Sequence, residues 1–309
     1  MKSTLLFAAL LAIATPSFAA EPAVPAANRY AATIAPVEQF DSGALAVEKH
    51  GTKGRSLILV PGLVSGTWAW QGVVRDLAAD HVIYIVTLPG FDGRAFPPGQ
   101  SFDAARAGLL ALIRDRKLDH PVLIGHSMGA ALGFAVAEEA PQAVGGIVAI
   151  DGLPVFPGTE TMTPAERATM AANIKTSMAA VDAATFARQQ QTYMRTAGVR
   201  DMGQAEQLAQ LSSRSNPVAA ATYVAEVLAL DLRPQLNVIT APILVLAPYF
   251  DQDPMDQRWT ADAKVRYYQS LLVGAPRVQV LPVVDSRHFI MFDQPQVLAT
   301  MLRTYLNAL

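Results

Sequence analysis

Short runs of consecutive apolar residues recur along the chain, separated by longer stretches in which apolar positions follow helical spacing. Such runs predict strands that are buried on both faces of a sheet. Because the runs alternate with predicted helices, we expect an α/β fold with a mostly parallel central sheet flanked by helices. The predicted strands are 43–50, 56–60, 82–86, 122–124, 146–150, 242–246 and 278–281.

Residues 152–235 break this alternation. They contain no strand-like run, and their Ala-, Met- and Gln-rich segments predict helices at 164–180, 183–196, 204–212 and 217–230. A helical segment inserted between two sheet strands lies over the carboxyl ends of the strands, where open α/β sheets bind ligands. We therefore expect a helical cap at 152–235, between the two parts of the core at 20–151 and 236–309.

The N-terminal segment MKSTLLFAALLAIATPSFAAEP has the pattern of a secretory signal peptide. One Lys precedes an apolar run from Leu5 to Ile13, and Ser17-Phe18-Ala19 has the small residues of a cleavage site. The run is too short to span a bilayer. We predict that residues 1–19 are a signal peptide, and that the mature protein is periplasmic or secreted.

Composition excludes several classes of function. A formal net charge of −2 provides no basic surface for nucleic acid and no polybasic membrane patch. The absence of Cys excludes a disulfide framework. No glycine-rich phosphate loop, metal-ligand spacing or membrane span stands out after the leader, so we expect no cofactor and no metal.

The sequence Gly125-His126-Ser127-Met128-Gly129 lies between a predicted strand and a buried apolar helix. This is the setting in which G-x-S-x-G forms a nucleophile elbow, the sharp turn that lifts a serine Oγ clear of the backbone. The alternative is a glycine-rich turn whose serine only caps the helix. The strand and helix on either side favour a nucleophilic Ser127.

A serine nucleophile needs a histidine as its base. His81 and His120 precede predicted strands and so lie at the opposite end of the sheet, while His50 belongs to the first predicted strand pair. His126 is too close in sequence to reach the serine with the required geometry. His288, in the loop after the 278–281 strand, is left by elimination.

The acid that orients the histidine is expected at the carboxyl end of a neighbouring strand. Asp251 follows the 242–246 strand and gives the chain order serine, acid, histidine that is typical of α/β-hydrolases. Asp253 and Asp256 are close rivals, and Asp151 at the end of the 146–150 strand is another position from which an acid could reach. We favour Asp251, then Asp253, then Asp151.

Two backbone N–H groups are expected to bind the oxyanion. One belongs to Met128, directly after the nucleophile, and the other to Leu63 in the loop after the 56–60 strand. An ordinary glycine turn is the alternative interpretation of that loop.

These motifs together resemble the α/β-hydrolase superfamily, in particular its capped serine esterase and haloperoxidase-like branch. The resemblance extends from about residue 40 to the C-terminus and rests on GHSMG, on LPGF at 88–91, on PILVL at 242–246 with its following Asp, and on HFIMFDQP at 288–295. It implies acyl transfer without a cofactor. Relatives with an Asp nucleophile are disfavoured because residue 127 is Ser.

The chain departs from the family pattern in two places. Pro61-Gly62 stands where the family commonly has His-Gly, and Arg287 stands where a Gly commonly precedes the histidine. Neither change removes a reacting group.

The expected partner is a small-molecule ester, cleaved through an acyl-enzyme on Ser127. An apolar acyl part is favoured because the predicted cap contains several methionines, which adapt to apolar ligands, although helix methionines more often belong to a core. A lactone or small amide is an alternative, and so is a hydrolase-fold binding protein without catalysis. An aminopeptidase would need a cap carboxylate, and the candidates Glu160, Glu166, Glu206 and Glu226 are interpreted as solvated.

Overall fold

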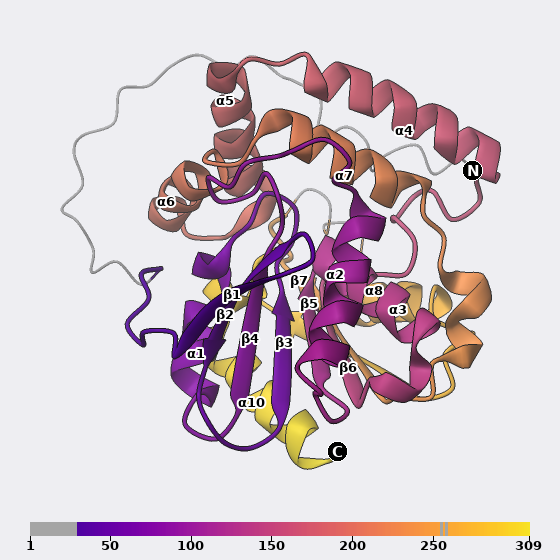
Figure 1. Ribbon diagram of the computed structural model, residues 1–309. Coiled ribbons are helices and arrows are strands. Elements are labelled where there is room, and N and C mark those ends of the chain that lie inside the picture. The colour runs from indigo at the N-terminus through magenta and orange to yellow at the C-terminus, as the bar shows by residue number, and fades with distance from the viewer. Residues whose placement is uncertain (1–29, 254–255, 257–258) are drawn as a thin grey trace.

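The computed structural model describes residues 30–253, 256 and 259–309, and within them the strands form one eight-stranded sheet (Figure 1). The strand order is β1-β2-β4-β3-β5-β6-β7-β8. The pairs β1–β2 and β2–β4 are antiparallel, and all other neighbours are parallel. The strands are β1 (Glu38–Ser42), β2 (Leu45–His50), β3 (Ser56–Val60), β4 (Val82–Thr87), β5 (Val122–His126), β6 (Gly146–Ile150), β7 (Ile243–Tyr249) and β8 (Val278–Val284).

Helices cover both faces of the sheet. α1 (Gln71–Leu77) and α10 (Pro295–Asn307) share a buried apolar cluster with one face, and α2 (Phe102–Asp115), α3 (Met128–Glu139) and α8 (Ala261–Ser270) share another with the opposite face. Each fully buried Leu, Ile or Val in these clusters contributes about 1.5–3 kcal/mol through its removal from water. The shorter helical segments are η1 (Thr67–Trp70), η2 (Pro141–Ala143), η4 (Arg233–Val238) and α9 (Ile290–Asp293).

Between β6 and β7 the chain forms a layer of helices above the carboxyl ends of the strands (Figure 1). Side chains at the helix starts accept backbone N–H groups, as in the Thr163–Glu166 capping box. A single bridge between Val155 and Asp231 joins the segments that enter and leave this layer. Its elements are α4 (Pro164–Ala179), α5 (Ala183–Tyr193), the π-helical turn η3 (Met194–Gly198), α6 (Met202–Ser212) and α7 (Pro217–Ala229).

The α/β-hydrolase fold expected from the sequence is confirmed, including the helices inserted between two sheet strands. The four helices α4–α7 begin within two residues of their expected starts. The strand β1 was missed because its residues alternate between half-buried and exposed and include Glu38 and Gln39, which do not form an apolar run. The predicted signal peptide lies outside the described residues.

The register of the central strands brings the loops after β5 and β6 together at the carboxyl ends of the strands. His126, the last residue of β5, pairs with Ile150, the last residue of β6. Ser127 and Asp151 directly follow these two strands, so they leave the sheet side by side. The Ser127 N–H also donates a hydrogen bond of 2.9 Å to the Ile150 carbonyl.

Candidate active site

Ser127 lies at the sharp turn between β5 and α3 that the sequence predicts. Its backbone has φ 53° and ψ −121°, a region that residues with a side chain rarely adopt. Gly125 and Gly129 permit this turn, since a Cβ on Gly125 would collide with the Gly129 backbone and one on Gly129 with the Val60 carbonyl. The turn leaves Ser127 half-buried between residues that are fully buried.

The loop after β3 lies directly against this turn. A Cβ on Gly62 would be 2.7 Å from Nδ1 of His126 and 3.1 Å from Cβ of Ser127, so only a glycine allows the two backbones to approach so closely. Leu63 follows in this loop, and Met128 begins α3, whose N-terminal dipole favours negative charge. Both predicted donor groups thus belong to segments that border Ser127, and their role in binding an oxyanion stays a prediction.

His288 lies beside the serine turn, in the loop between β8 and α9. Its imidazole ring is 4.4 Å from that of His126, measured between ring centroids. The Nε2 atom of His126 lies 3.1 Å from the His288 carbonyl oxygen. Of the five histidines, His288 is therefore the one that the structure brings to the Ser127 turn from a distant part of the sequence.

The carboxylate that contacts His288 is that of Asp151. Its Oδ2 lies 2.5 Å from Nδ1 of His288, and both side chains are largely buried. This contact leaves the Nε2 edge of the imidazole as the proton acceptor, which is the orientation that a serine–histidine–acid triad requires. Asp151 was the third choice from the sequence.

The preference for Asp251 as the orienting acid is therefore wrong. β7 continues to Tyr249, and Asp251 lies beyond it in an exposed turn. Asp253, the second choice, is buried but pairs with Arg287, with Oδ2 3.2 Å from Nε. Asp256 binds Nζ of Lys264 at 2.9 Å.

Asp151 is held in its ionised form. Burial raises the pKa of its carboxyl group, but the hydrogen bond and charge of His288, the charge of Lys264 and the hydrogen bond from Tyr268 outweigh this effect. The resulting pKa is about 2. The hydroxyl of Tyr268 donates to Oδ1 at 2.5 Å, so both carboxylate oxygens have a donor.

His126 stays neutral beside this pair. Burial and the neighbouring His288 hold the pKa of its imidazole well below the usual range. Since Nε2 donates to the His288 carbonyl, His126 supports the loop that carries His288.

The π-helical turn η3 docks onto the same loop. The His288 N–H donates to the Ala197 carbonyl at 3.2 Å, and Nη1 of Arg287 donates to the Arg195 carbonyl at 2.8 Å. The ring of Tyr193 lies edge-on to His288, with centroids 6.0 Å apart. Arg287, a departure from the family pattern, thus fastens the cap to the histidine loop.

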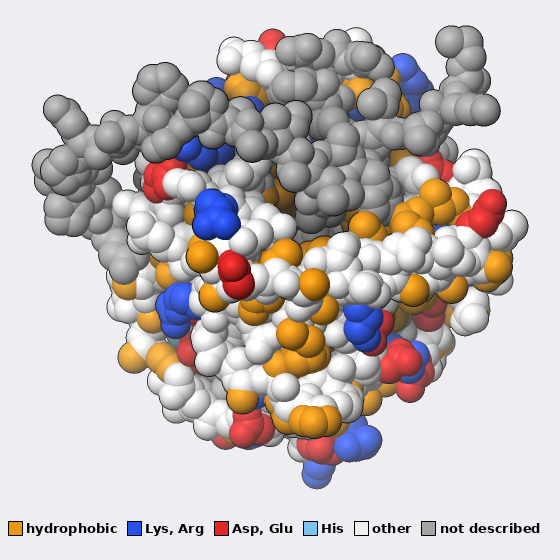
Figure 2. Space-filling view, turned by 90° about the horizontal axis from the view of Figure 1, so that it is seen from above, with side chains coloured by type: hydrophobic (Ala, Val, Ile, Leu, Met, Phe, Trp, Pro, Cys, Tyr) orange, Lys and Arg blue, Asp and Glu red, His pale blue; other side chains and the backbone are white. Residues whose placement is uncertain are grey.

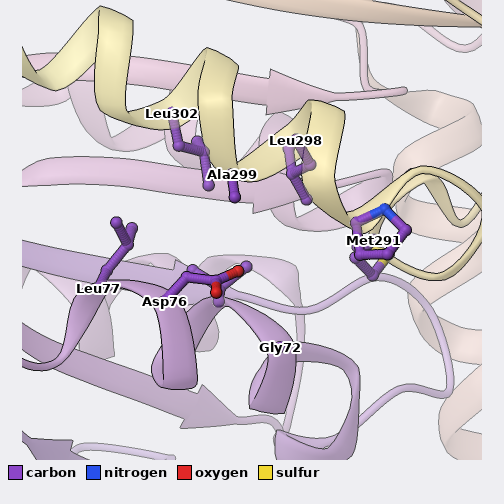
Figure 3. Close-up of a pocket in the computed structure, with 9 residues that line it drawn as sticks. Gly72, Asp76, Leu77, Met291, Leu298, Ala299 and Leu302 are labelled. Carbon is purple, nitrogen blue, oxygen red and sulfur yellow. The ribbon is translucent and has the colours of Figure 1, made fainter.

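The small cavity in Figure 3 is not the substrate site. It lies between α1 and α10, and its volume of about 10 Å³ is that of roughly one water molecule. Its lining is mainly apolar, with Asp76 at one side.

Within residues 30–253, 256 and 259–309, no group of three or more His, Asp or Glu side chains could hold a metal ion. In the same part of the chain, no helix is both long enough and apolar enough to cross a membrane. Seen from above, the charged side chains of the described residues are scattered and do not form a patch of one sign (Figure 2).

A family model described as "Alpha/beta hydrolase family" matches residues 57–301, which include Ser127, Asp151 and His288. This match covers most of the chain. The chain belongs to the alpha/beta hydrolase family.

Curated relatives match over a shorter region. The chain is 30% identical over 105 residues to N-formylmaleamate deformylase of Pseudomonas putida, which is 33% of this chain and 39% of that protein. It is 28% identical over 104 residues to pimeloyl-[acyl-carrier protein] methyl ester esterase of Vibrio parahaemolyticus, covering 34% and 39%. The matches thus span about two fifths of each relative's length.

Solved structures share the fold over most of the chain. A thermophilic esterase from Thermogutta terrifontis superposes with a TM-score of 0.70 at 18% identity, over 88% of this chain and 99% of that one. A bromoperoxidase from Bacillus anthracis gives 0.67 at 16% identity, over 87% and 100%. These similarities confirm the fold expected from the sequence, and the family match over residues 57–301 confirms the superfamily.

Two residues of the site were underestimated or missed by sequence reasoning. The position of Asp151 could have identified it, since Asp151 and Ser127 each directly follow a buried strand and the two strands are paired. The sequence does not single out Tyr268, because a tyrosine within a helix such as α8 usually only packs against the core.

Proposed function

We propose that this chain is an exported serine hydrolase that cleaves a carboxylic ester through an acyl-enzyme on Ser127. His288 is the general base and acid, and Asp151 orients its imidazole. The observation that carries the proposal is the 2.5 Å contact between Nδ1 of His288 and Oδ2 of Asp151, next to a serine in a strained strand-to-helix turn. An ionised acid paired with a histidine can activate a serine hydroxyl, whereas a glycine-rich turn whose serine only caps the helix needs no such pair.

The reaction follows from these contacts in two steps. Oγ of Ser127 attacks the ester carbonyl as its proton passes to Nε2 of His288, and the N–H groups of Leu63 and Met128 bind the oxyanion. The C–O bond breaks, and His288 returns the proton to the departing alcohol. Water then attacks the acyl-enzyme, His288 takes its proton, and the carboxylic acid leaves as Ser127 regains its hydrogen.

The surroundings of Leu63 favour an apolar acyl group. Leu63 packs against a cluster of buried apolar side chains from α4 and α7. Half-buried Phe156, Met170 and Met178 border the same cluster, and methionine side chains adapt to apolar ligands of varied shape. Its buried members are Ala171, Ile174, Val224, Ala225 and Leu228.

An aminopeptidase finds less support, because the four candidate carboxylates already have partners. Glu160 accepts a hydrogen bond from the Tyr267 hydroxyl, and Glu166 belongs to the capping box of α4. Glu206 pairs with Arg195, and Glu226 accepts the Phe102 N–H. A small amide stays the second candidate, since one similar relative is named as a deformylase.

Labelling with a fluorophosphonate probe tests the proposal. The wild-type protein is expected to be labelled, and Ser127→Ala is expected to lose the label entirely because the probe reacts with an activated serine hydroxyl. Heat-denatured wild type is the control for non-specific reaction. An unlabelled wild type would contradict the hydrolase proposal and favour a binding protein.

A panel of esters, lactones and formyl amides then identifies the bond that is cleaved. We expect kcat/KM to be highest for esters and to rise with the length of an apolar acyl chain, because the α4–α7 cluster borders Leu63. Higher kcat/KM for formyl amides would transfer the proposal to amide hydrolysis.

Export is proposed from the signal-peptide pattern of residues 1–19 alone. Expression of the full chain in a bacterial host, followed by fractionation and N-terminal sequencing, is expected to give a periplasmic or secreted protein that begins at residue 20. An uncleaved chain in the cytoplasmic fraction would refute this part of the proposal.

A further inference from the structure

The carboxylate of Asp151 is held from two sides. Its Oδ2 faces Nδ1 of His288, and its Oδ1 accepts the hydroxyl proton of Tyr268, with both distances 2.5 Å. Tyr268 is buried, on the face of α8 that packs into the sheet core. The second contact comes from a helix that contributes no reacting group.

A carboxylate with only one partner is free to rotate about its Cβ–Cγ bond, because this torsion has a broad energy profile. A donor on the second oxygen fixes the plane of the group, as hydrogen bonds behind metal ligands and catalytic groups do. The backbone of Asp151 also has φ 45°, so the carboxylate starts from an unusual direction that a second contact stabilises.

The charged and titratable groups around Asp151 come from several elements. They are His288 after β8, His126 in β5, Lys264 and Tyr268 on α8, and Tyr193 on α5. Burial raises the pKa of the Tyr268 phenol well above its usual value, and the charge of Asp151 raises it further. Tyr268 therefore keeps its proton and stays a donor at neutral pH.

We propose that Tyr268 is a positioning residue of the triad: its hydroxyl holds Oδ1 of Asp151 so that Oδ2 faces Nδ1 of His288. This inference rests on the proposed hydrolase function. Tyr268 supplies no reacting group and acts through its contact with Asp151.

The preceding residue provides a matched control. Tyr267 is half-buried on the same helix, and its hydroxyl donates to Oε1 of Glu160 at 3.1 Å, at the base of the cap. Tyr267→Phe and Tyr268→Phe therefore remove the same atom from adjacent positions, but only the second changes a contact of Asp151.

With the best ester substrate, Tyr268→Phe is expected to lower kcat about tenfold and to change KM less than about twofold. The acidic limb of the pH profile should move to lower pH, since a carboxylate that rotates away from Nδ1 stabilises the imidazolium less. Tyr267→Phe should leave kcat and the limb unchanged. A Tyr268→Phe enzyme with wild-type kcat and pH profile would overturn the proposal.

The double variant distinguishes positioning from a general effect on the fold. In an Asp151→Asn background, Tyr268→Phe should cause no further loss of kcat, because the carboxylate on which it acts is gone. A further tenfold loss in that background would overturn the role through Asp151.

A readout without turnover separates this inference from the proposed function. The Nδ1 proton of His288, which faces Oδ2 of Asp151, should resonate less far downfield in Tyr268→Phe than in wild type or Tyr267→Phe. Identical Nδ1 proton shifts in the three proteins would overturn the positioning role even in an active enzyme. If the wild type resists the fluorophosphonate, the hydrolase proposal fails, while the resonances still report whether Tyr268 orients the pair.

Discussion

The loops after β6 and β7 both begin at the carboxyl ends of the strands and both contain aspartates, but these aspartates make different contacts. β6 ends at Ile150, and the next residue, Asp151, contacts His288. β7 extends to Tyr249, and its loop places Asp251 in an exposed turn and directs Asp253 to Arg287. The first loop supplies an acid to the imidazole, whereas the second stabilises the loop that carries it.

The difference shows that strand length and register decide which carboxylate reaches the histidine. Asp151 leaves the sheet beside Ser127, because His126 and Ile150 are paired. Asp253 still serves the histidine loop, since Arg287 directly precedes His288 and also donates to cap carbonyls. We therefore expect aspartates on the loops after two adjacent strands to have different effects, one on the proposed chemistry and one on stability.

The largest expected effect is a difference in kcat between variants of the two loops. Asp151→Asn should lower kcat by about 10³- to 10⁴-fold, because an amide cannot orient and stabilise the imidazolium as a carboxylate does. Asp251→Asn should keep kcat within about twofold, since its side chain is exposed. Steady-state kinetics of both variants, with circular dichroism to check folding, test this difference. The reverse pattern of losses would restore Asp251 as the acid.

A smaller effect is expected on the stability of the second loop. Asp253→Asn leaves the guanidinium of Arg287 without the carboxylate it faces, and both side chains are almost fully buried. We expect the free energy of unfolding to fall by about 3 kcal/mol, measured by denaturant titration.

The kcat of Asp253→Asn should stay within about threefold of wild type, and Asp251→Asn should change the unfolding free energy by less than about 0.5 kcal/mol. An Asp253→Asn enzyme that keeps its stability but loses activity as Asp151→Asn does would show that the second loop acts on the chemistry.

The sequence predicted the central strands and the Ser127 turn, because both depend on the pattern of neighbouring residues. Continuous apolar runs predicted the central strands, and a glycine-flanked serine between a strand and a helix predicted the turn at Ser127. Elimination among five histidines identified His288, because strand direction alone excluded those at the opposite end of the sheet.

The acid could not be chosen in this way. Asp151, Asp251 and Asp253 all follow apolar strands, and the choice among them depends on how far each strand continues and where its loop turns. Tyr268 was beyond prediction for a related reason: its contact with Asp151 joins residues 117 positions apart, through the packing of α8 on the sheet. Sequence periodicity contains no information on such a contact.

The most direct test of the central claim is an NMR measurement of the Nδ1 proton of His288. A proton shared between an imidazole and a carboxylate at a short distance resonates far downfield. We predict that this signal is present in the wild type and in Asp251→Asn and absent from Asp151→Asn. A signal that persists in Asp151→Asn and disappears in Asp251→Asn would contradict the assignment of Asp151 as the acid that orients His288.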